Sequence, residues 1–220
     1  MLRYILTSII CITAFIIIGI AVSPKPGFQI QSVIKFDELV SSVVSSYHSH
    51  LLDNFMIVLS EYGREIVWVG VIILFSIFKG WKGKKIALVI VISFLIIIPL
   101  NTLLKNYFER PRPPIEGQDI RITQNITQKV DFAYPSGHAS IVSGGALILM
   151  MMFRKGKETI FSVVMMAEAI LVCISRIYVG DHYLFDVIGG IMLGAGVSLC
   201  SISFSRYLDP IIARVQRYLK

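Results

Sequence analysis

Long apolar runs separated by short polar stretches make up most of the chain. Six of them approach the roughly 20 residues that a helix needs to cross a bilayer, at about residues 4–23, 60–78, 86–104, 137–153, 159–177 and 186–205. The second run opens with three charged side chains, Glu61, Arg64 and Glu65, so its start is left open. The pattern predicts an all-α polytopic membrane protein, built as a bundle of six transmembrane helices.

The composition also indicates a membrane protein. Of the 220 residues, 55% are hydrophobic and only 16% are charged, which is less polar surface than a soluble domain of this length requires. The length fits a single membrane domain over residues 1–220, and no linker or internal repeat divides it. The three cysteines, Cys11, Cys173 and Cys200, lie inside apolar runs, so neither a disulfide framework nor a metal-ligand spacing is predicted.

The charged residues between the runs differ from one side of the predicted bundle to the other. The N-terminus, the second and fourth connections and the C-terminus together carry 12 basic and two acidic residues, whereas the opposite connections carry 9 basic and 11 acidic ones. The positive-inside rule therefore predicts that both termini are cytoplasmic, which agrees with an even number of spans. The net charge of +7 is thus mostly a topology signal, and it requires no nucleic-acid partner.

The connection between the first two runs, about residues 24–59, mixes apolar and polar positions. This mixture predicts one or two helices that lie along the outer membrane surface. His48 and His50 fall in this segment and could suggest a metal site. Residues two apart in a helix do not share a face, and no third ligand is evident, so a solvated interfacial pair is the better interpretation.

Three polar clusters fall on the outer side of the predicted bundle. They are KNYFERPRP, Lys105 to Pro113, at the end of the third run; YPSGHAS, Tyr134 to Ser140, at the start of the fourth; and SRIYVGDHYLFD, Ser175 to Asp186, between the fifth and sixth. Tens of residues separate the clusters along the chain. The topology nevertheless brings all three to one depth, where they can form a single site.

The clusters together offer the groups that bind and attack a phosphoryl group. Lys105, Arg112 and Arg176 are cations with few acidic neighbours, which suits a multiply charged anion such as phosphate. Ser136 and Gly137 open a predicted helix whose free N–H groups can face an oxyanion, and His138 follows on its first turn.

His182 and Asp186 are four residues apart, so they are expected to share one helical face. A carboxylate there can fix the tautomer of the imidazole and leave its other nitrogen free to attack. Any one of these residues is more simply read as an ordinary interfacial side chain. The functional interpretation rests on the whole set, because all of these residues fall on the outer side of the predicted bundle and at these spacings.

These clusters resemble the signature of the type 2 phosphatidic acid phosphatase (PAP2) superfamily, which also includes the vanadium haloperoxidases. The signature reads K-x6-RP, then PSGH, then SR-x5-H-x3-D. Every position is matched in this chain, by Lys105 with Arg112–Pro113, by Pro135 to His138, and by Ser175–Arg176 with His182 and Asp186. Three motifs in order are far more specific than PSGH alone, and the resemblance covers about residues 60–205.

The resemblance implies a role for each matched residue. His182 would be the nucleophile that forms a phosphohistidine, Asp186 would orient it, and His138 would be the general acid for the leaving group. The phosphate would be held by the remaining matched positions, Lys105, Arg112, Ser136, Gly137 and Arg176. No metal or other cofactor is implied, in keeping with the lack of clustered carboxylates for a divalent cation.

The leading prediction is therefore an integral membrane phosphatase, in the cell membrane, with its site on the outer face. Candidate substrates are a polyprenyl diphosphate, phosphatidylglycerol phosphate or phosphatidate; the expected partners are this lipid and the membrane, and no obligate protein partner is evident. Phosphotransfer to an alcohol through the same intermediate is an alternative, and a lipid or anion transporter is a weaker one. A haloperoxidase is disfavoured because that branch of the superfamily is soluble.

Two further features carry structural predictions. Gly190 and Gly194 form a GxxxG pattern in the sixth run, which predicts a close contact with another helix of the chain. Asp181 belongs to no part of the signature and is predicted to cap the following helix. The polar stretch from Pro114 to Tyr134 is read either as a lid over the site or as a plain connection.

Overall fold

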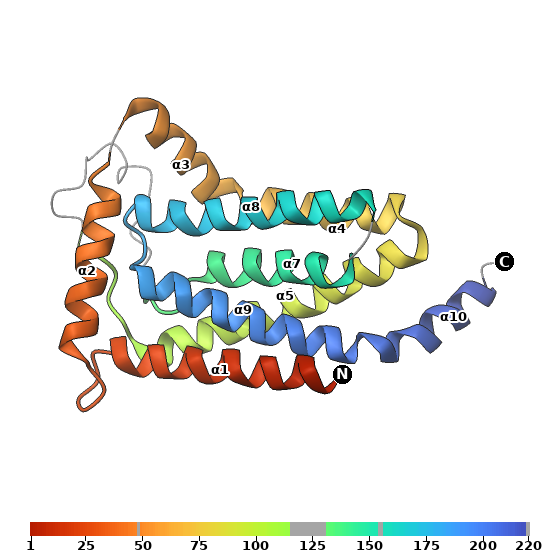
Figure 1. Ribbon diagram of the computed structural model, residues 1–220, viewed down its shortest axis with the longest axis horizontal. Helices are drawn as coiled ribbons and strands as arrows, with labels where there is room; N and C mark the ends of the chain where they lie inside the picture. The colour runs from red at the N-terminus through yellow and green to blue at the C-terminus, as the bar shows by residue number, and fades with distance from the viewer. Residues whose placement is uncertain (48, 115–130, 154–155, 219–220) are drawn as a thin grey trace.

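The computed structural model describes the whole chain except residues 48, 115–130, 154–155 and 219–220. Within the described ranges every regular element is a helix. Six helices run side by side along the long axis of the molecule (Figure 1), namely α1 (Leu2–Val22), α4 (Glu65–Phe78), α5 (Gly80–Phe108), α7 (Gly137–Met152), α8 (Lys157–Tyr178) and α9 (Leu184–Phe204). The expectation of an all-α bundle is confirmed.

The remaining elements lie at the two ends of the bundle. At one end, α2 (Gln31–Ser45) crosses the bundle axis and α3 (His50–Tyr62) leads obliquely into α4 (Figure 1). At the other end, a short 3₁₀ turn (Ser205–Leu208) links α9 to α10 (Asp209–Tyr218), and the N-terminus of α1 lies at this same end. The start of α1 and helix α10 are thus remote from α2.

The lengths of the helices suit a membrane. Four described stretches are long and apolar enough to cross a bilayer, α1, α5, α8 and the stretch Leu184–Arg214, while α4 and α7 are shorter apolar helices of 14 and 16 residues. Large apolar side chains also point away from the bundle, for example Ile10 (67% exposed), Leu95 (66%) and Ile66 (63%). Such outward apolar faces need lipid around them, so the chain is an integral membrane protein.

Two boundaries differ from those predicted. The second run does not begin at residue 60, because Ser60 and Tyr62 belong to α3 and the helix of the second run begins only at Glu65. The third run is longer than predicted, since α5 takes in Gly80 at one end and Phe108 at the other. Polar residues can extend a helix past its apolar stretch, which hydrophobicity alone does not report.

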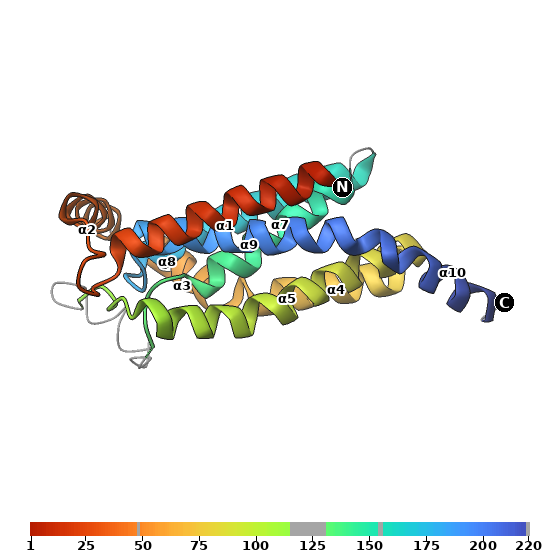
Figure 2. The same cartoon turned by 90° about the horizontal axis from the view of Figure 1, so that it is seen from below.

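Helix α7 occupies the centre of the bundle. It packs against α5, α8 and α9 (Figure 2), and most of its side chains are buried. Small residues allow this close packing: a methyl group built on Gly190 would lie 2.5 Å from the carbonyl oxygen of Ser136, and one on Gly194 would overlap that of Ser140. The predicted close helix contact of the GxxxG pattern is therefore confirmed, and its partner is α7.

The segment between α1 and α4 contains the two helices that the sequence predicted there. Helix α2 turns large apolar side chains outward, including Phe36 and Leu39. Its buried residues are polar, Asp37 and Ser41. A surface helix usually buries apolar side chains, so this inverted pattern indicates that α2 makes a specific polar contact with the bundle. The proposed interfacial pair cannot be assessed, since His48 lies outside the described residues.

We expect Gly194→Ala to destabilise the bundle, because its methyl group would meet the backbone of α7. Overpacking of this kind costs about 1–3 kcal/mol. Gly70→Ala in α4 is the matched control, since a methyl group there meets nothing within 4 Å; helix propensity predicts a neutral or slightly stabilising effect there. Thermal unfolding in detergent compares the two variants, and equal midpoints would contradict the tight α7–α9 contact.

Candidate active site

The three polar clusters meet at the end of the bundle where α2 lies. They border a cavity of about 150 Å³. Six of the predicted site residues line it, Lys105, Arg112, Gly137, His138, Arg176 and His182. The other two, Ser136 and Asp186, are fully buried beside it. The prediction that topology would bring the clusters together is thus correct.

Ser136 has a structural position at the start of α7. Its hydroxyl oxygen accepts a weak hydrogen bond of 3.5 Å from the N–H of Ala139, as an N-cap does. Its own N–H donates to the carbonyl oxygen of Asp186 at 3.0 Å, which joins the second cluster to the third. The helix start was therefore predicted correctly, and it presents Gly137 and His138 to the cavity.

Lys105 and Arg112 share an anionic partner that the sequence analysis missed. The ammonium group of Lys105 donates to both carboxylate oxygens of Asp131, at 2.7 and 2.8 Å, and Arg112 donates to one of them at 2.6 Å. The expectation that these cations have few anions to pair with was wrong. Although partial burial alone would raise the pKa of Asp131, the two cations hold it below its usual range.

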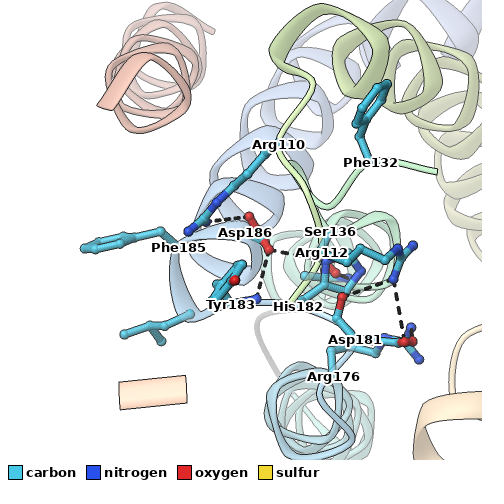
Figure 3. A network of polar contacts seen from close by, with 12 residues as sticks. Arg110, Arg112, Phe132, Ser136, Arg176, Asp181, His182, Tyr183, Phe185 and Asp186 are labelled. Carbon is cyan, nitrogen blue, oxygen red and sulfur yellow. Dashed lines mark hydrogen bonds and ion pairs between the residues drawn. The ribbon is translucent and has the colours of Figure 1, made fainter. Parts of the chain in front are cut away.

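Arg176 is also paired. It donates a hydrogen bond to the carboxylate of Asp181 and another to the carbonyl oxygen of Ser60, the latter at 3.1 Å. Asp181 therefore does not cap α9 as predicted, because its carboxylate faces Arg176 instead (Figure 3). The backbone turn after α8 makes this possible at Gly180, whose φ of 75° is a left-handed conformation that favours glycine.

His182 and Asp186 are close, but they are not arranged as two residues on one helical face. His182 precedes α9, whereas Asp186 lies in its first turn. Nδ1 of His182 is 3.6 Å from Oδ2 of Asp186, slightly too long for a hydrogen bond. The same oxygen accepts the N–H of Tyr183 at 2.9 Å.

Arg110 is the main residue that the sequence analysis missed. Its guanidinium donates to Asp186 and to Asp37, both at 2.7 Å, and all three side chains are at most 4% exposed. Figure 3 shows Arg110 reaching Asp186 from the side away from His182. Its one sequence signal was the doubled Arg-Pro pattern, in which only Arg112 fits the spacing of the signature.

Helix α2 completes this network by capping α9. Asp37 accepts the N–H of Phe185 at 2.9 Å, and the hydroxyl of Ser41 accepts that of Leu184 at 3.1 Å. Free N–H groups at a buried helix start need such partners. This contact explains the polar buried face of α2. Burial raises the pKa of Asp37, an effect that the charge of Arg110 opposes.

The electrostatic surroundings of His182 favour a neutral imidazole. The side chain is 2% exposed, and the cations Arg176, Arg112 and Lys105 face the same cavity. Burial, followed by repulsion from these three cations, holds the pKa of His182 well below its ordinary value of 6.5. A neutral ring is the form that can act as a nucleophile.

Comparisons with known proteins agree with this arrangement. A family model described as the PAP2 superfamily matches residues 83–209. An undecaprenyl-diphosphatase of Sulfolobus acidocaldarius is 38% identical over 170 residues, which cover 77% of each chain. The undecaprenyl-diphosphatase BcrC of Bacillus subtilis is 25% identical over 78% of this chain and 84% of its own.

The fold is also that of a solved structure. The crystal structure of a transmembrane PAP2-type phosphatidylglycerolphosphate phosphatase from Bacillus subtilis superposes with a TM-score of 0.70 and 22% identity, covering 92% of this chain and 97% of that one. The apolar bundle with a cationic, histidine-bearing cavity is that of a membrane phosphatase for lipid phosphates. The chain belongs to the PAP2 superfamily.

We expect Arg110→Ala to destabilise the protein strongly, because it leaves Asp37 and Asp186 as unpaired buried carboxylates. Breaking a buried ion pair in this way costs about 3–5 kcal/mol. Lys25→Ala is the control on the same side of the bundle, where an exposed pair with Glu109 at 3.7 Å is worth at most about 1 kcal/mol. The unfolding midpoints of the two variants are measured in detergent. Equal midpoints would contradict the ion-pair network of Arg110.

We expect the ring of His182 to remain neutral at pH 6.5. The chain has four histidines, so ring-¹⁵N-histidine NMR in detergent can resolve them, and His182→Ala assigns the signal. Because burial and three cations disfavour the protonated form, the ring takes up its proton only below pH 6.5. Removing one cation in Arg112→Gln should move the midpoint upward. A midpoint at or above 6.5 in the native protein would contradict the electrostatic argument.

Proposed function

We propose that this protein hydrolyses a polyprenyl diphosphate to the monophosphate and inorganic phosphate, through a phosphohistidine on His182. The observation that carries the proposal is the shared cavity, which His182, His138 and three cations all line. The 38% identity to an undecaprenyl-diphosphatase favours a diphosphate of this kind over the other lipid phosphates. Apolar residues beside the cations, Ile97, Ile98 and Ile141, suit a lipid tail.

The proposed first step transfers the terminal phosphoryl group to the enzyme. Nδ1 of His182 faces Asp186, which leaves Nε2 as the attacking nitrogen. A P–N bond forms while the bond from phosphorus to the bridging oxygen breaks. His138 gives its proton to that oxygen, which leaves as the lipid monophosphate. Lys105, Arg112 and Arg176, with the N–H of Gly137, balance the charge on the transferred group.

The proposed second step restores the enzyme. Water attacks the phosphohistidine, and His138, now neutral, accepts its proton. The P–N bond breaks, inorganic phosphate leaves, and His182 becomes neutral again. The hydroxyl of Ser136, which is buried in this structure, would bind phosphate only after turning from its capping position. The chemistry as written uses protein side chains and water, and it needs no cofactor.

We also propose the placement of the molecule in the cell membrane. All six bundle helices would cross it, with α4 and α7 short because they begin beside the recessed site. The start of α1 and helix α10 lie at the end opposite the site (Figure 1), and the connections predicted on their side carry most of the basic residues, which supports cytoplasmic termini and an extracytoplasmic site. Residues 1–220 would act as one domain, with the lipid substrate as its partner.

The test is phosphate release from a panel of prenyl diphosphates, prenyl monophosphates and phosphatidylglycerol phosphate, in detergent with a chelator present. We expect turnover to be greatest with a diphosphate. His182→Ala should lower it by about 10³-fold or more, the usual result of removing a nucleophile, and His138→Ala by about 10²–10⁴-fold.

Acid-labile labelling of the native protein by a [³²P]-diphosphate, absent in His182→Ala, would identify the intermediate. Equal phosphate release from native and His182→Ala protein would exclude the proposed mechanism. Efficient transfer to an added alcohol in place of water would instead point to a phosphotransferase.

A further inference from the structure

The cavity has a fourth cation that no part of the three clusters contains. Arg64 lies at the residue before α4, and its side chain lines the same cavity as Arg176 and His182. It is only 27% exposed. In the sequence it reads as one of several charges at the uncertain start of the second run, so nothing there marked it for a role in the site.

The position of Arg64 is defined by α7. A methyl group built on Gly137 would lie 3.9 Å from its guanidinium and 3.6 Å from the amide oxygen of Asn101. The guanidinium thus lies close to Gly137, the first residue of α7, and lines the same cavity as His138. Lys105 and Arg112 line the same cavity and are both paired with Asp131.

Arg64 adds positive charge to a cavity that other cations already line, and its carboxylate partner is accessible. Its partner is the neighbouring Glu65, whose side chain is half exposed. Arg176 faces the cavity too, and two like charges beside one small cavity repel each other. Burial and this repulsion lower the pKa of Arg64 to about 10, so the group remains a cation at neutral pH.

A lipid diphosphate has two phosphates, and the proposed reaction treats them differently. His182 and its cations receive the terminal phosphate, which is transferred. The second phosphate stays on the lipid and leaves with the oxygen that His138 protonates, so it must lie on the His138 side of the cavity. A lipid monophosphate has only an ester oxygen there.

Resting on the proposed function, we propose that Arg64 binds the lipid-proximal phosphate of a diphosphate substrate and so makes the site prefer diphosphates to monophosphates. A guanidinium can form two parallel hydrogen bonds to a phosphate. Because the leaving group of a diphosphate gains negative charge as the bridging bond breaks, the contact also strengthens during the reaction.

The experiment compares kcat/KM for farnesyl diphosphate and farnesyl monophosphate, which share one tail. For Arg64→Gln we expect a loss of about 10- to 100-fold with the diphosphate, the range for a lost hydrogen bond to a charged group. The loss with the monophosphate should stay within about threefold, which also shows that the variant is folded. Arg64→Lys should retain part of the preference, because it keeps the charge without the paired donors.

Arg206→Gln is the matched control. Arg206 is an exposed arginine at the opposite end of the bundle, where it contacts Tyr207. This variant should leave kcat/KM unchanged for both substrates. A second measurement needs no turnover: the inhibition constant of farnesyl methylene-bisphosphonate should rise in Arg64→Lys, and that of farnesyl phosphonate should not. If Arg64→Gln fails to fold, these inhibition constants still test whether Arg64 binds the lipid-proximal phosphate.

Equal losses on both substrates, or no loss on either, would overturn the assignment of Arg64. The outcomes also separate this inference from the proposed function. Native protein that releases phosphate from neither lipid contradicts the proposed function itself. Native protein that hydrolyses the monophosphate as well as the diphosphate, with no change in that ratio in Arg64→Gln, leaves the phosphatase intact and refutes only the diphosphate-selective role.

Discussion

The buried guanidinium of Arg110 holds together three parts of the chain that are distant in sequence. It pairs with Asp37 in α2 and with Asp186 in α9, each at 2.7 Å, and it follows α5. Removing three charges from water is costly, and the cost is offset only when each charge has a partner with good geometry. The orientation of Asp186, whose carboxylate lies 3.6 Å from the ring of His182, therefore depends on where α2 lies.

The cations of the cavity also have carboxylate partners, and one of these carboxylates is exposed. Asp131 is 44% exposed and neutralises Lys105 and Arg112, while Asp181 pairs with the buried Arg176. These carboxylates keep the cations partnered when no substrate is bound. A phosphate offers more charge and more acceptor oxygens than one carboxylate, so it can compete for Lys105 and Arg112 as it enters. The most exposed of the pairs, that of Asp131, is the easiest to replace.

Local sequence patterns predicted which residues meet at the cavity, but they did not predict the ion pairs between residues distant in sequence. The helix start at Ser136 and the GxxxG contact follow from residue types at short spacings, and both are found. The ion pair of Arg110 with Asp37 joins residues 73 apart, and that of Lys105 with Asp131 joins residues 26 apart. No periodicity reports such contacts. The prediction that His182 and Asp186 share one helical face was also wrong. Their spacing of four residues fits a single helix, but α9 begins between them.

The distance between the start of α7, which carries His138, and the start of α9, which follows His182, is set by backbone contact rather than by side-chain length. Gly190 and Gly194 let α9 approach the backbone of α7, and the N–H of Ser136 bonds to the carbonyl of Asp186 at 3.0 Å. His138 follows Ser136 by two residues, and His182 precedes α9 by two. Because main-chain atoms are far less adaptable than long side chains, this contact fixes both histidines on one cavity. The cations around the histidines are carried on longer side chains, which in the proposed mechanism adjust to the phosphate.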